Sequence, residues 1–230
     1  MYHPGIAAIG SSMTFDRPIR ELRLVSAPAD APSPAGEWCP RTFVLTDIVG
    51  SVALWERATD QMSSAVARHE ALIRREITAA GGTLVRARGE GDSTFAVFVR
   101  PLDAIAAVAA IQDVLAAEPW PPLTPVRVRA GVHTGEAEGR DGDWYGPTVN
   151  RAARLRCLAT GAQTLVSGVT AGLVADRMPA ALRLTYRGRR HLRGIARPED
   201  VWELTPASMP PRQRRRSRRR TLAGAGRLPA

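Results

Sequence analysis

Two aspartates stand where a divalent metal ion could be held. Asp47 closes the extended, β-branched run "RTFVLTDIV", and Asp92 lies in the turn of "VRARGEGDSTFAVF". Carboxylate oxygens suit Mg²⁺ or Mn²⁺, which keep further positions for phosphate oxygens, and the glycines around Asp92 let a phosphate approach the backbone. Each aspartate alone is also an ordinary strand-end or turn residue. The metal interpretation therefore requires that the two carboxylates converge.

A second pair of side chains could handle a nucleotide. Asn150 and Arg154 in "DWYGPTVNRAAR" are four residues apart, so they share one face of the helix that this segment predicts. The Asn amide can orient a ribose or a phosphate, and the Arg guanidinium can neutralise phosphate charge through two parallel hydrogen bonds. The alternative is a solvated pair without a ligand, which is common for these residue types.

The elements that must position these side chains follow the order β-α-β-β-α-β. Apolar spacing, alternation and the breakers Gly81-Gly82 and Pro119 define them. We expect a strand at 41–49, a helix over 50–82, a strand–turn–strand over 83–99, a helix over 103–119 and a strand over 125–135. An added helix over 146–159, with Pro147 near its start, a short strand, a short helix and two closing strands follow.

This order predicts an α/β (α+β) fold: a ferredoxin-like βαββαβ core with an added helix and small C-terminal strands. The expected sheet carries its helices on one face. In such a sheet the first strand and the hairpin are central neighbours, which would bring Asp47 and Asp92 to one spot. The fold by itself does not decide the chemistry.

Length and composition predict one medium-sized domain with two tails. At 230 residues and 44% hydrophobic content the chain can form a proper core. We expect a disordered segment over 1–40, rich in Pro, Ala, Gly and Ser, a folded domain over 41–206 and a disordered tail over 207–230. No run approaches the ~18 apolar residues of a membrane span, no secretion signal is visible, and two cysteines suit a reducing compartment. These features predict a cytoplasmic protein.

The charge of the chain is unevenly distributed. All 32 basic residues are arginine, and seven of them lie in the segment Arg212–Arg220, which carries most of the net charge of +10. Such a run can contact nucleic acid or an anionic membrane by charge alone, or it can be a solvated tail without a partner. The absence of lysine excludes a P-loop nucleotide site.

Four segments together resemble the catalytic domain of class III nucleotidyl cyclases of the bacterial type. They are "FVLTDIVGS", "GEGDSTFAVF", "VRAGVHTGEAEGRDGDWYGPTVNRAAR" and "GAQTLVS", and the resemblance covers roughly residues 41–206. It implies an adenylyl or guanylyl cyclase whose sites form between two chains arranged head to tail. One chain supplies the metal-binding acids and its partner supplies the other residues, so the active protein would be a homodimer.

The resemblance also implies a role for each matching residue. Asp47 and Asp92, helped by the Ile48 carbonyl, match the positions that hold two divalent metal ions. Asn150 and Arg154 match the pair that orients the ribose and stabilises the transition state. Asp143 matches one of the two positions that contact the purine. An ionised aspartate accepts a hydrogen bond from the amino group of adenine and repels the carbonyl of guanine, so Asp143 favours ATP as the substrate.

One position departs from the family pattern. The family's adenine-contacting lysine falls four residues before the second metal acid, where this chain has Arg88. Alternation along the strand places Arg86 and Arg88 on the face opposite Val85 and Ala87, which would present Arg88 toward a site. Arginine still donates hydrogen bonds, but it is longer and planar. The substitution leaves turnover and base choice open.

Two alternatives to an active adenylyl cyclase follow from the same residues. A catalytically silent cyclase-like domain would bind nucleotide or dimerise and act as a regulatory module, and Arg88 is the feature that favours it. A diguanylate cyclase also has an acidic, glycine-rich hairpin, but its signature has no counterpart of Asn150 and Arg154.

Overall fold

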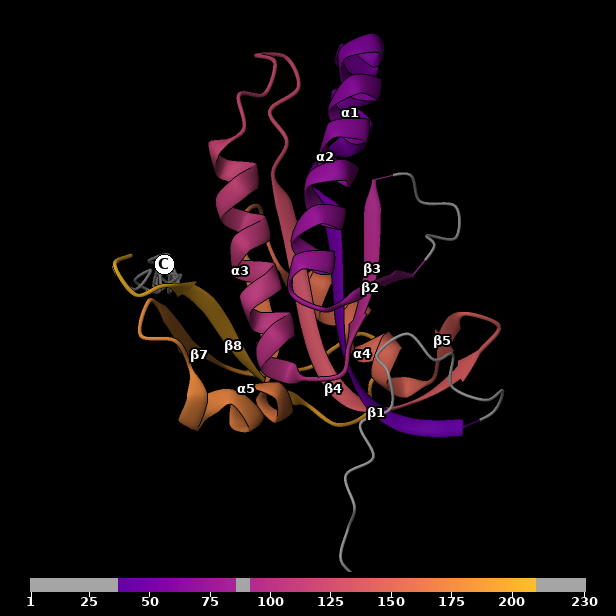
Figure 1. Cartoon of the computed structure of the whole chain (residues 1–230), viewed down its shortest axis with the longest axis vertical. Helices are drawn as coiled ribbons and strands as arrows, with labels where there is room; N and C mark the ends of the chain where they lie inside the picture. Colours follow the sequence, from indigo (N-terminus) through magenta and orange to yellow (C-terminus); the bar gives the residue numbers. More distant parts are fainter. Residues whose placement is uncertain (1–36, 86–91, 210–230) are drawn as a thin grey trace, which may run out of the picture. The chain divides into compact units, whose positions relative to one another are not determined.

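The computed structural model describes residues 37–85 and 92–209, which form one mixed sheet with helices on both faces (Figure 1). Arg86, Arg88, most of the 1–40 segment and the arginine-rich tail lie outside the described residues. The strands are β1 (Glu37–Ile48), β2 (Thr83–Val85), β3 (Ser93–Phe98), β4 (Val128–Arg140), β5 (Asp143–Tyr145), β6 (Thr164–Ser167), β7 (Leu182–Arg190) and β8 (Glu199–Pro206). The helices are α1 (Ser51–Arg57), α2 (Thr59–Ala79), α3 (Pro101–Ala117), α4 (Pro147–Leu158), α5 (Gly168–Val174) and the 3₁₀ turn η1 (Ala175–Arg177).

The order of the strands confirms the predicted ferredoxin-like core. The sheet runs β2-β3-β1-β4-β6-β8-β7, and β5 pairs with β4 beside this path. The pairs β2–β3, β3–β1 and β1–β4 are all antiparallel, and β1 lies between β3 and β4. β4 and β6 are parallel neighbours, and the closing hairpin β7–β8 extends the sheet on that side.

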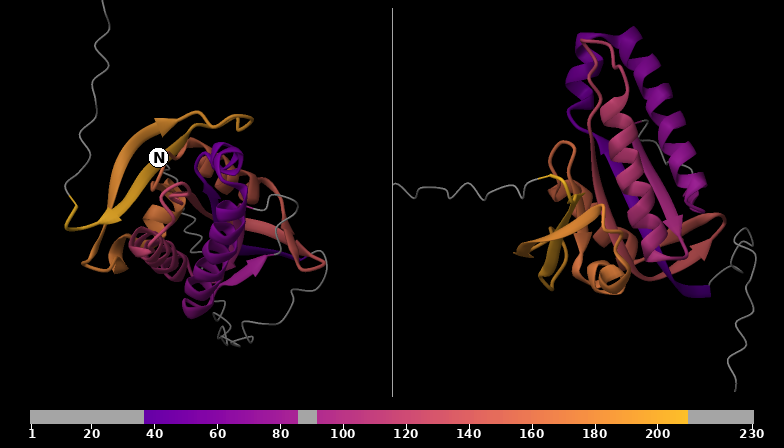
Figure 2. Two further views of the ribbon diagram at one scale, coloured as in Figure 1. Left: turned by 90° about the horizontal axis from the view of Figure 1, so that it is seen from above. Right: turned by 60° about the vertical axis from the view of Figure 1, so that its left-hand side comes forward.

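The main core lies between the sheet and the helices α2, α3 and α5. Figure 2 shows α2 and α3 side by side on this face. Apolar side chains of α2 and α3 recur at helical spacing and meet the alternate residues of β1 and β4 that point the same way, such as Val44, Ile48 and Val132. This arrangement fixes which residues of β1 face the helices, and therefore places Asp47 on the other face of the sheet.

The core helices α2 and α3 lie on one face as expected, and the added helix α4 packs on the opposite face. The close approach depends on Gly131 of β4, because a Cβ atom there would lie 2.3 Å from the backbone nitrogen of Arg156. Ala152 and Leu155 of α4 are fully buried, and Ala152 packs with Phe43 and Leu45 of β1. The two glycines of "AGVHTG", Gly131 and Gly135, were the signal for a helix on this face.

Two further elements differ from expectation. The helix predicted over 50–82 is interrupted at Ala58, whose backbone is extended (φ −158°, ψ 72°), and the Thr59 hydroxyl donates to the Trp55 carbonyl at the break, 3.0 Å away. The strand β5 was not predicted. It folds back on β4 through Asp141-Gly142, whose φ angles of 54° and 74° suit the Asp-Gly turn of a tight hairpin.

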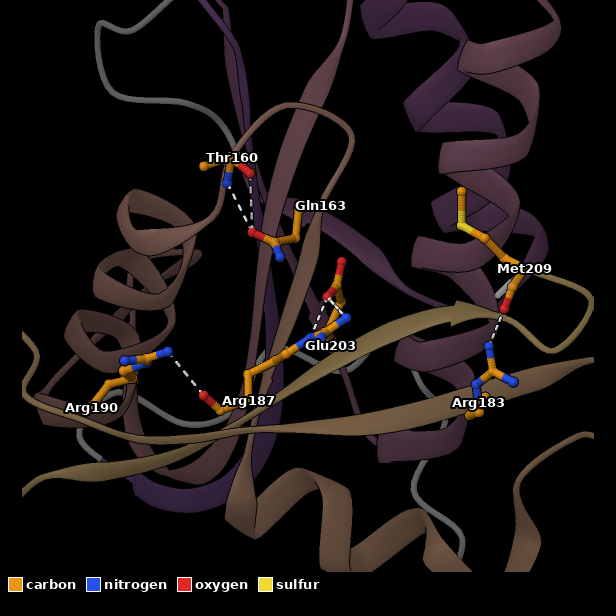
Figure 3. Close-up of polar contacts among 7 residues, drawn as sticks. All are labelled: Thr160, Gln163, Arg183, Arg187, Arg190, Glu203 and Met209. Carbon is orange, nitrogen blue, oxygen red and sulfur yellow. Dashed lines mark hydrogen bonds and ion pairs between the residues drawn. The ribbon is translucent and has the colours of Figure 1, made fainter. Parts of the chain in front are cut away.

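The closing hairpin β7–β8 is held by a shielded ion pair. The Arg187 guanidinium donates from Nε to Glu203 Oε2 at 2.5 Å, and the two side chains are 18% and 5% exposed (Figure 3). Near the other end of β7, Arg183 donates to the Met209 carbonyl. Both contacts lie within the hairpin, whereas the pairing of β8 with β6 and the packing of Leu165 and Val201 against Leu155 of α4 attach it to the sheet. Within 37–85 and 92–209, no helix is both long and apolar enough to cross a membrane.

Candidate active site

The first strand and the hairpin bring Asp47, Ile48 and Asp92 to one end of the sheet. Asp47 lies directly across from Ser93 of β3, and the Ile48 N–H donates to the Asp92 carbonyl at 3.3 Å. The Ile48 side chain is buried in the core at 1% exposure, so this residue can offer a ligand only its backbone oxygen. The predicted convergence of these three residues is therefore present in the backbone.

Sequence analysis missed Arg129, which lies directly across from Asp47 on β4. Its guanidinium donates from Nε to Asp47 Oδ2 at 2.8 Å and also from Nη2 to the same oxygen. The Asp47 side chain is 14% exposed and that of Arg129 is 31% exposed. The alternation in "VRVRAG" showed that an arginine would stand on one face of this strand, but the sequence did not show which residue of β1 it would face.

A second arginine reaches the same region from α4. The Arg156 guanidinium donates to the Thr46 carbonyl at 3.5 Å, one residue before Asp47. The end of the sheet that carries Asp47 and Asp92 therefore also carries positive charge from β4 and α4. Such a mixture of carboxylates and guanidinium groups suits a ligand that combines metal ions with phosphates.

The ligand set at this end fits a hard divalent ion that is completed by its substrate. Among the described residues there is no group of three or more His, Cys, Asp or Glu side chains that could enclose a metal by itself. Asp47 and Asp92 offer two carboxylates, and Ile48 offers a carbonyl. Mg²⁺ and Mn²⁺ sites that use one or two carboxylates take their remaining ligands from water and substrate phosphates.

Asp143 lies at the far end of β4. It pairs with Arg140, whereas Asp47 pairs with Arg129, and the eleven residue steps from Arg129 to Arg140 span up to about 36 Å at about 3.3 Å per step. In Figure 1 these ends correspond to α1 at the top of the view and β5 at the lower right. Asp143 Oδ1 accepts a hydrogen bond from the Trp144 N–H at 2.8 Å. One chain therefore does not bring Asp143 to Asp47.

Asn150 and Arg154 point away from the sheet of their own chain. The buried residues of α4 are Thr148, Ala152 and Leu155, which define the face that contacts β4 and β1. At 3.6 residues per turn, Asn150 and Arg154 lie roughly 200° and 240° around the helix from Thr148. Both are exposed. The pair therefore shares one face, as predicted, and that face is directed outward.

Two histidines, His69 of α2 and His133 of β4, are buried in the domain. Burial lowers the pKa of His69 of α2 to about 4 against the opposing effect of the Asp92 and Glu70 carboxylates, and burial lowers the pKa of His133 of β4 to about 4 with a smaller contribution from the Arg151 cation. Neither ring nitrogen of His69 has a hydrogen-bond partner among the described residues. Both side chains are therefore neutral at pH 7.

His133 belongs to a buried chain of hydroxyl groups. Its Nδ1 lies 2.8 Å from the Ser167 Oγ, which lies 3.0 Å from the Thr170 Oγ1. Thr134 continues the chain at 2.9 Å to Thr170 and 2.9 Å to Thr42. This hydrogen-bond network connects β1, β4, β6 and α5. It holds β4, the strand that carries Arg129 and Gly131, in register with its neighbours.

Comparisons with known proteins agree on one family. Residues 40–205 match the family model of the adenylate and guanylate cyclase catalytic domain. An uncharacterised protein of Mycobacterium tuberculosis is 41% identical over 163 residues, which are 71% of this chain and 55% of that protein. A receptor-type adenylate cyclase of Trypanosoma congolense is 30% identical over 214 residues, covering 74% of this chain and 28% of that protein.

A solved structure supports the same assignment. The adenylate/guanylate cyclase/hydrolase from Silicibacter pomeroyi superimposes with a TM-score of 0.66 at 28% identity, over 74% of this chain and 99% of that one. This chain spans about half the length of the mycobacterial relative, 55%, and a smaller share of the trypanosomal one.

Proposed function

Because the chain belongs to the adenylate and guanylate cyclase catalytic domain family, we propose that it is a homodimeric adenylyl cyclase, a lyase that converts ATP to 3′,5′-cyclic AMP and pyrophosphate. One observation carries the proposal: the residues expected in the site lie in two separate places on one chain. Asp47, Ile48 and Asp92 lie at one end of the sheet, whereas Asp143 lies at the far end of β4. Asn150 and Arg154 face outward from α4.

Two copies arranged head to tail would complete each site. The outward face of α4 on one copy would lie over the metal end of the other, which places Asn150 and Arg154 opposite Asp47 and Asp92 of the second copy. A two-fold axis makes such an interface self-complementary and creates two equivalent sites. A single copy would keep every residue and still lack a site.

Within that site the carboxylates of Asp47 and Asp92 and the Ile48 carbonyl would hold two divalent ions, Mg²⁺ or Mn²⁺. When bound, these ions supply the positive charge that lowers the pKa of the ribose 3′-hydroxyl and clamps the phosphates for in-line attack. The 3′-oxygen forms a bond to the α-phosphorus, the bond from that phosphorus to the bridging oxygen breaks, pyrophosphate leaves, and the hydroxyl proton passes to water.

The residues of α4 would act on the reacting groups directly. Arg154 offsets the charge on the α-phosphoryl oxygens, and Asn150 holds the ribose so that the 3′-oxygen meets the phosphorus in line. Asp143 accepts a hydrogen bond from the adenine amino group. Arg88, which lies outside the described residues, would take the place of the adenine-contacting lysine. The cytoplasmic location, the domain bounds 41–206 and a partner for the Arg212–Arg220 segment stay predictions.

The deciding experiment measures cyclic nucleotide production by the purified protein with ATP or GTP, in Mn²⁺ and in Mg²⁺. Cyclic AMP that disappears in an Asp47→Ala control would support the proposal and show that Arg88 serves in place of lysine. Cyclic GMP as the main product would correct the substrate. No product from a folded, dimeric protein that still binds ATP would favour the silent regulatory domain, and recovery of activity with Arg88→Lys would then identify the cause.

A further inference from the structure

The proposed metal site already contains a cation supplied by the protein. Arg129 donates two N–H groups to a single oxygen of Asp47, and the Nε to Oδ2 distance is 2.8 Å. The pair is set by the backbone, since the two residues are direct cross-strand neighbours on β1 and β4. With side chains only 14% and 31% exposed, the interaction is less screened by water and salt than one on the open surface.

A divalent ion at Asp47 would meet this guanidinium. Each carboxylate oxygen offers about two lone-pair sites, and Oδ2 receives both of its N–H contacts from Arg129. A metal that binds Asp47 through both oxygens must displace at least one of these contacts, and a metal on the other oxygen places two like charges within a few ångströms. In either geometry the arginine and the metal compete for the same carboxylate.

We infer that Arg129 is a resident counter-cation of the metal site. It holds the Asp47 carboxylate in position while no metal is bound, and it releases that carboxylate, at least in part, when a metal enters. The affinity for metal is thereby set by an exchange of cations rather than by binding to a free carboxylate. This inference deepens the proposed function and rests on its assignment of Asp47 to the metal.

The chain contains a closely matched control for this arginine. Arg127 lies two residues earlier and carries the same charge, but it is exposed and forms no ion pair within the described residues. Removing its charge changes the electrostatic field near Asp47 without breaking a contact to that carboxylate, because Arg129 and not Arg127 is its cross-strand neighbour. Comparing the two positions separates competition for the carboxylate from a general field effect.

The test measures Mn²⁺ binding without nucleotide, by the loss of the electron paramagnetic resonance signal of free Mn²⁺. Arg129→Gln is expected to bind Mn²⁺ about tenfold more tightly than the wild type, whereas Arg127→Gln should stay within about twofold. Asp47→Asn should remove the binding. In the presence of a chelator, Arg129→Gln should unfold at a lower temperature than the wild type. Added Mn²⁺ should raise the unfolding temperature of Arg129→Gln by more than it raises that of the wild type.

Each outcome decides the question. Equal gains in Mn²⁺ affinity in Arg129→Gln and Arg127→Gln would show a general electrostatic field effect and overturn the inference. Unchanged or weaker Mn²⁺ binding in Arg129→Gln would overturn it as well. In both cases binding that depends on Asp47 would leave the proposed function standing. If neither the wild type nor any variant binds Mn²⁺, the metal assignment fails together with the inference. Should Arg129→Gln not fold, Arg129→Lys carries the test, with an expected gain smaller than tenfold because the charge remains.

Discussion

The two halves of the proposed site lie along β4 in opposite conditions. At the Asp47 end the side chains are shielded, and Arg129 pairs with Asp47 across the strands. At the far end Asp143 sits in a three-residue hairpin strand, and between the two ends Asn150 and Arg154 are exposed on the outer face of α4. One half is held by contacts within the chain, and the other is presented to solvent.

This difference indicates why such a domain would need a second copy. The shielded half is held by the ion pair between Arg129 and Asp47, so it can form in a single chain. The exposed residues Asn150 and Arg154 face away from the acids of their own chain. Head-to-tail pairing would satisfy both halves at once, because the exposed residues of one copy would cover the shielded acids of the other.

The largest expected effect comes from separating the two halves genetically. Asp47→Ala and Arg154→Ala should each lower turnover by at least about 10³-fold, since one removes metal binding and the other removes the charge that stabilises the transition state. Mixing the two variants in equal amounts should restore about a quarter of wild-type activity, because half of the dimers then contain one intact site. The measurement is cyclic AMP formation by each variant and by the mixture.

Two variants that damage the same half provide the control for this mixture. Asp47→Ala mixed with Asp92→Ala should stay inactive, because every site then carries at least one defective acid set. Recovery in that pairing, or none between Asp47→Ala and Arg154→Ala, would contradict a site assembled from two chains.

Acid should destabilise the folded domain through the two buried histidines. Above the unfolded-state pKa of 6.5, His69 and His133 are neutral whether the chain is folded or not, so stability is fully retained. Between that pKa and about 4 only the unfolded chain takes up the proton, which lowers the free energy of unfolding by roughly 3 kcal/mol per histidine at pH 4. Urea unfolding from pH 8 to pH 4 measures this loss.

A single replacement assigns part of the acid loss to His69. His69→Met should remove about half of the dependence on pH, and it breaks no hydrogen bond, because the imidazole has no hydrogen-bond partner among the described residues. His191→Met makes the same change of residue type at an exposed position and is the control. An unaltered slope in His69→Met would show that other groups cause the loss.

The packing of α4 against β4 should be disrupted by a single added methyl group at Gly131. Gly131→Ala places a Cβ atom 2.3 Å from the Arg156 nitrogen and 2.5 Å from the Ala152 carbonyl oxygen, which are backbone atoms that can move only with the helix. We expect a loss of about 2 kcal/mol in stability and lower activity, because Asn150 and Arg154 would shift with α4. Gly172→Ala in α5 is the control. A Cβ atom there would meet no atom outside the backbone of its own helix within 4 Å, so this variant should keep the stability of the wild type. Thermal unfolding and turnover of both variants provide the measurement.

The smallest expected effect concerns the choice of base at the exposed end. Asp143→Asn replaces a pure acceptor by an amide that can also donate, so kcat/KM for ATP should fall about tenfold relative to that for GTP. Asp141→Asn in the same turn is the control, since its φ of 54° is one that Asn tolerates. An unchanged ratio of the two substrates would remove Asp143 from base selection.

Local patterns explain the parts of the fold that could be predicted. Strand alternation and helical spacing identified the βαββαβ order, and the Gly-rich hairpin of Asp92 with the strand end of Asp47 predicted one half of the proposed site. The break at Ala58 and the short strand β5 were missed because each depends on a few backbone angles rather than on periodicity. Arg88, the most consequential departure from the family pattern, lies outside the described residues, and its role stays a prediction.

The sequence by itself determined which residues can do chemistry and on which kind of element each stands, because residue type and spacing are local properties. Only the tertiary structure decided which of them meet. The pairing of Asp47 with Arg129, 82 residues later, follows from the register of β1 against β4. The position of α4 on the second face follows from the missing Cβ of Gly131. Register and close approach arise between segments far apart in the chain, where no local pattern records them.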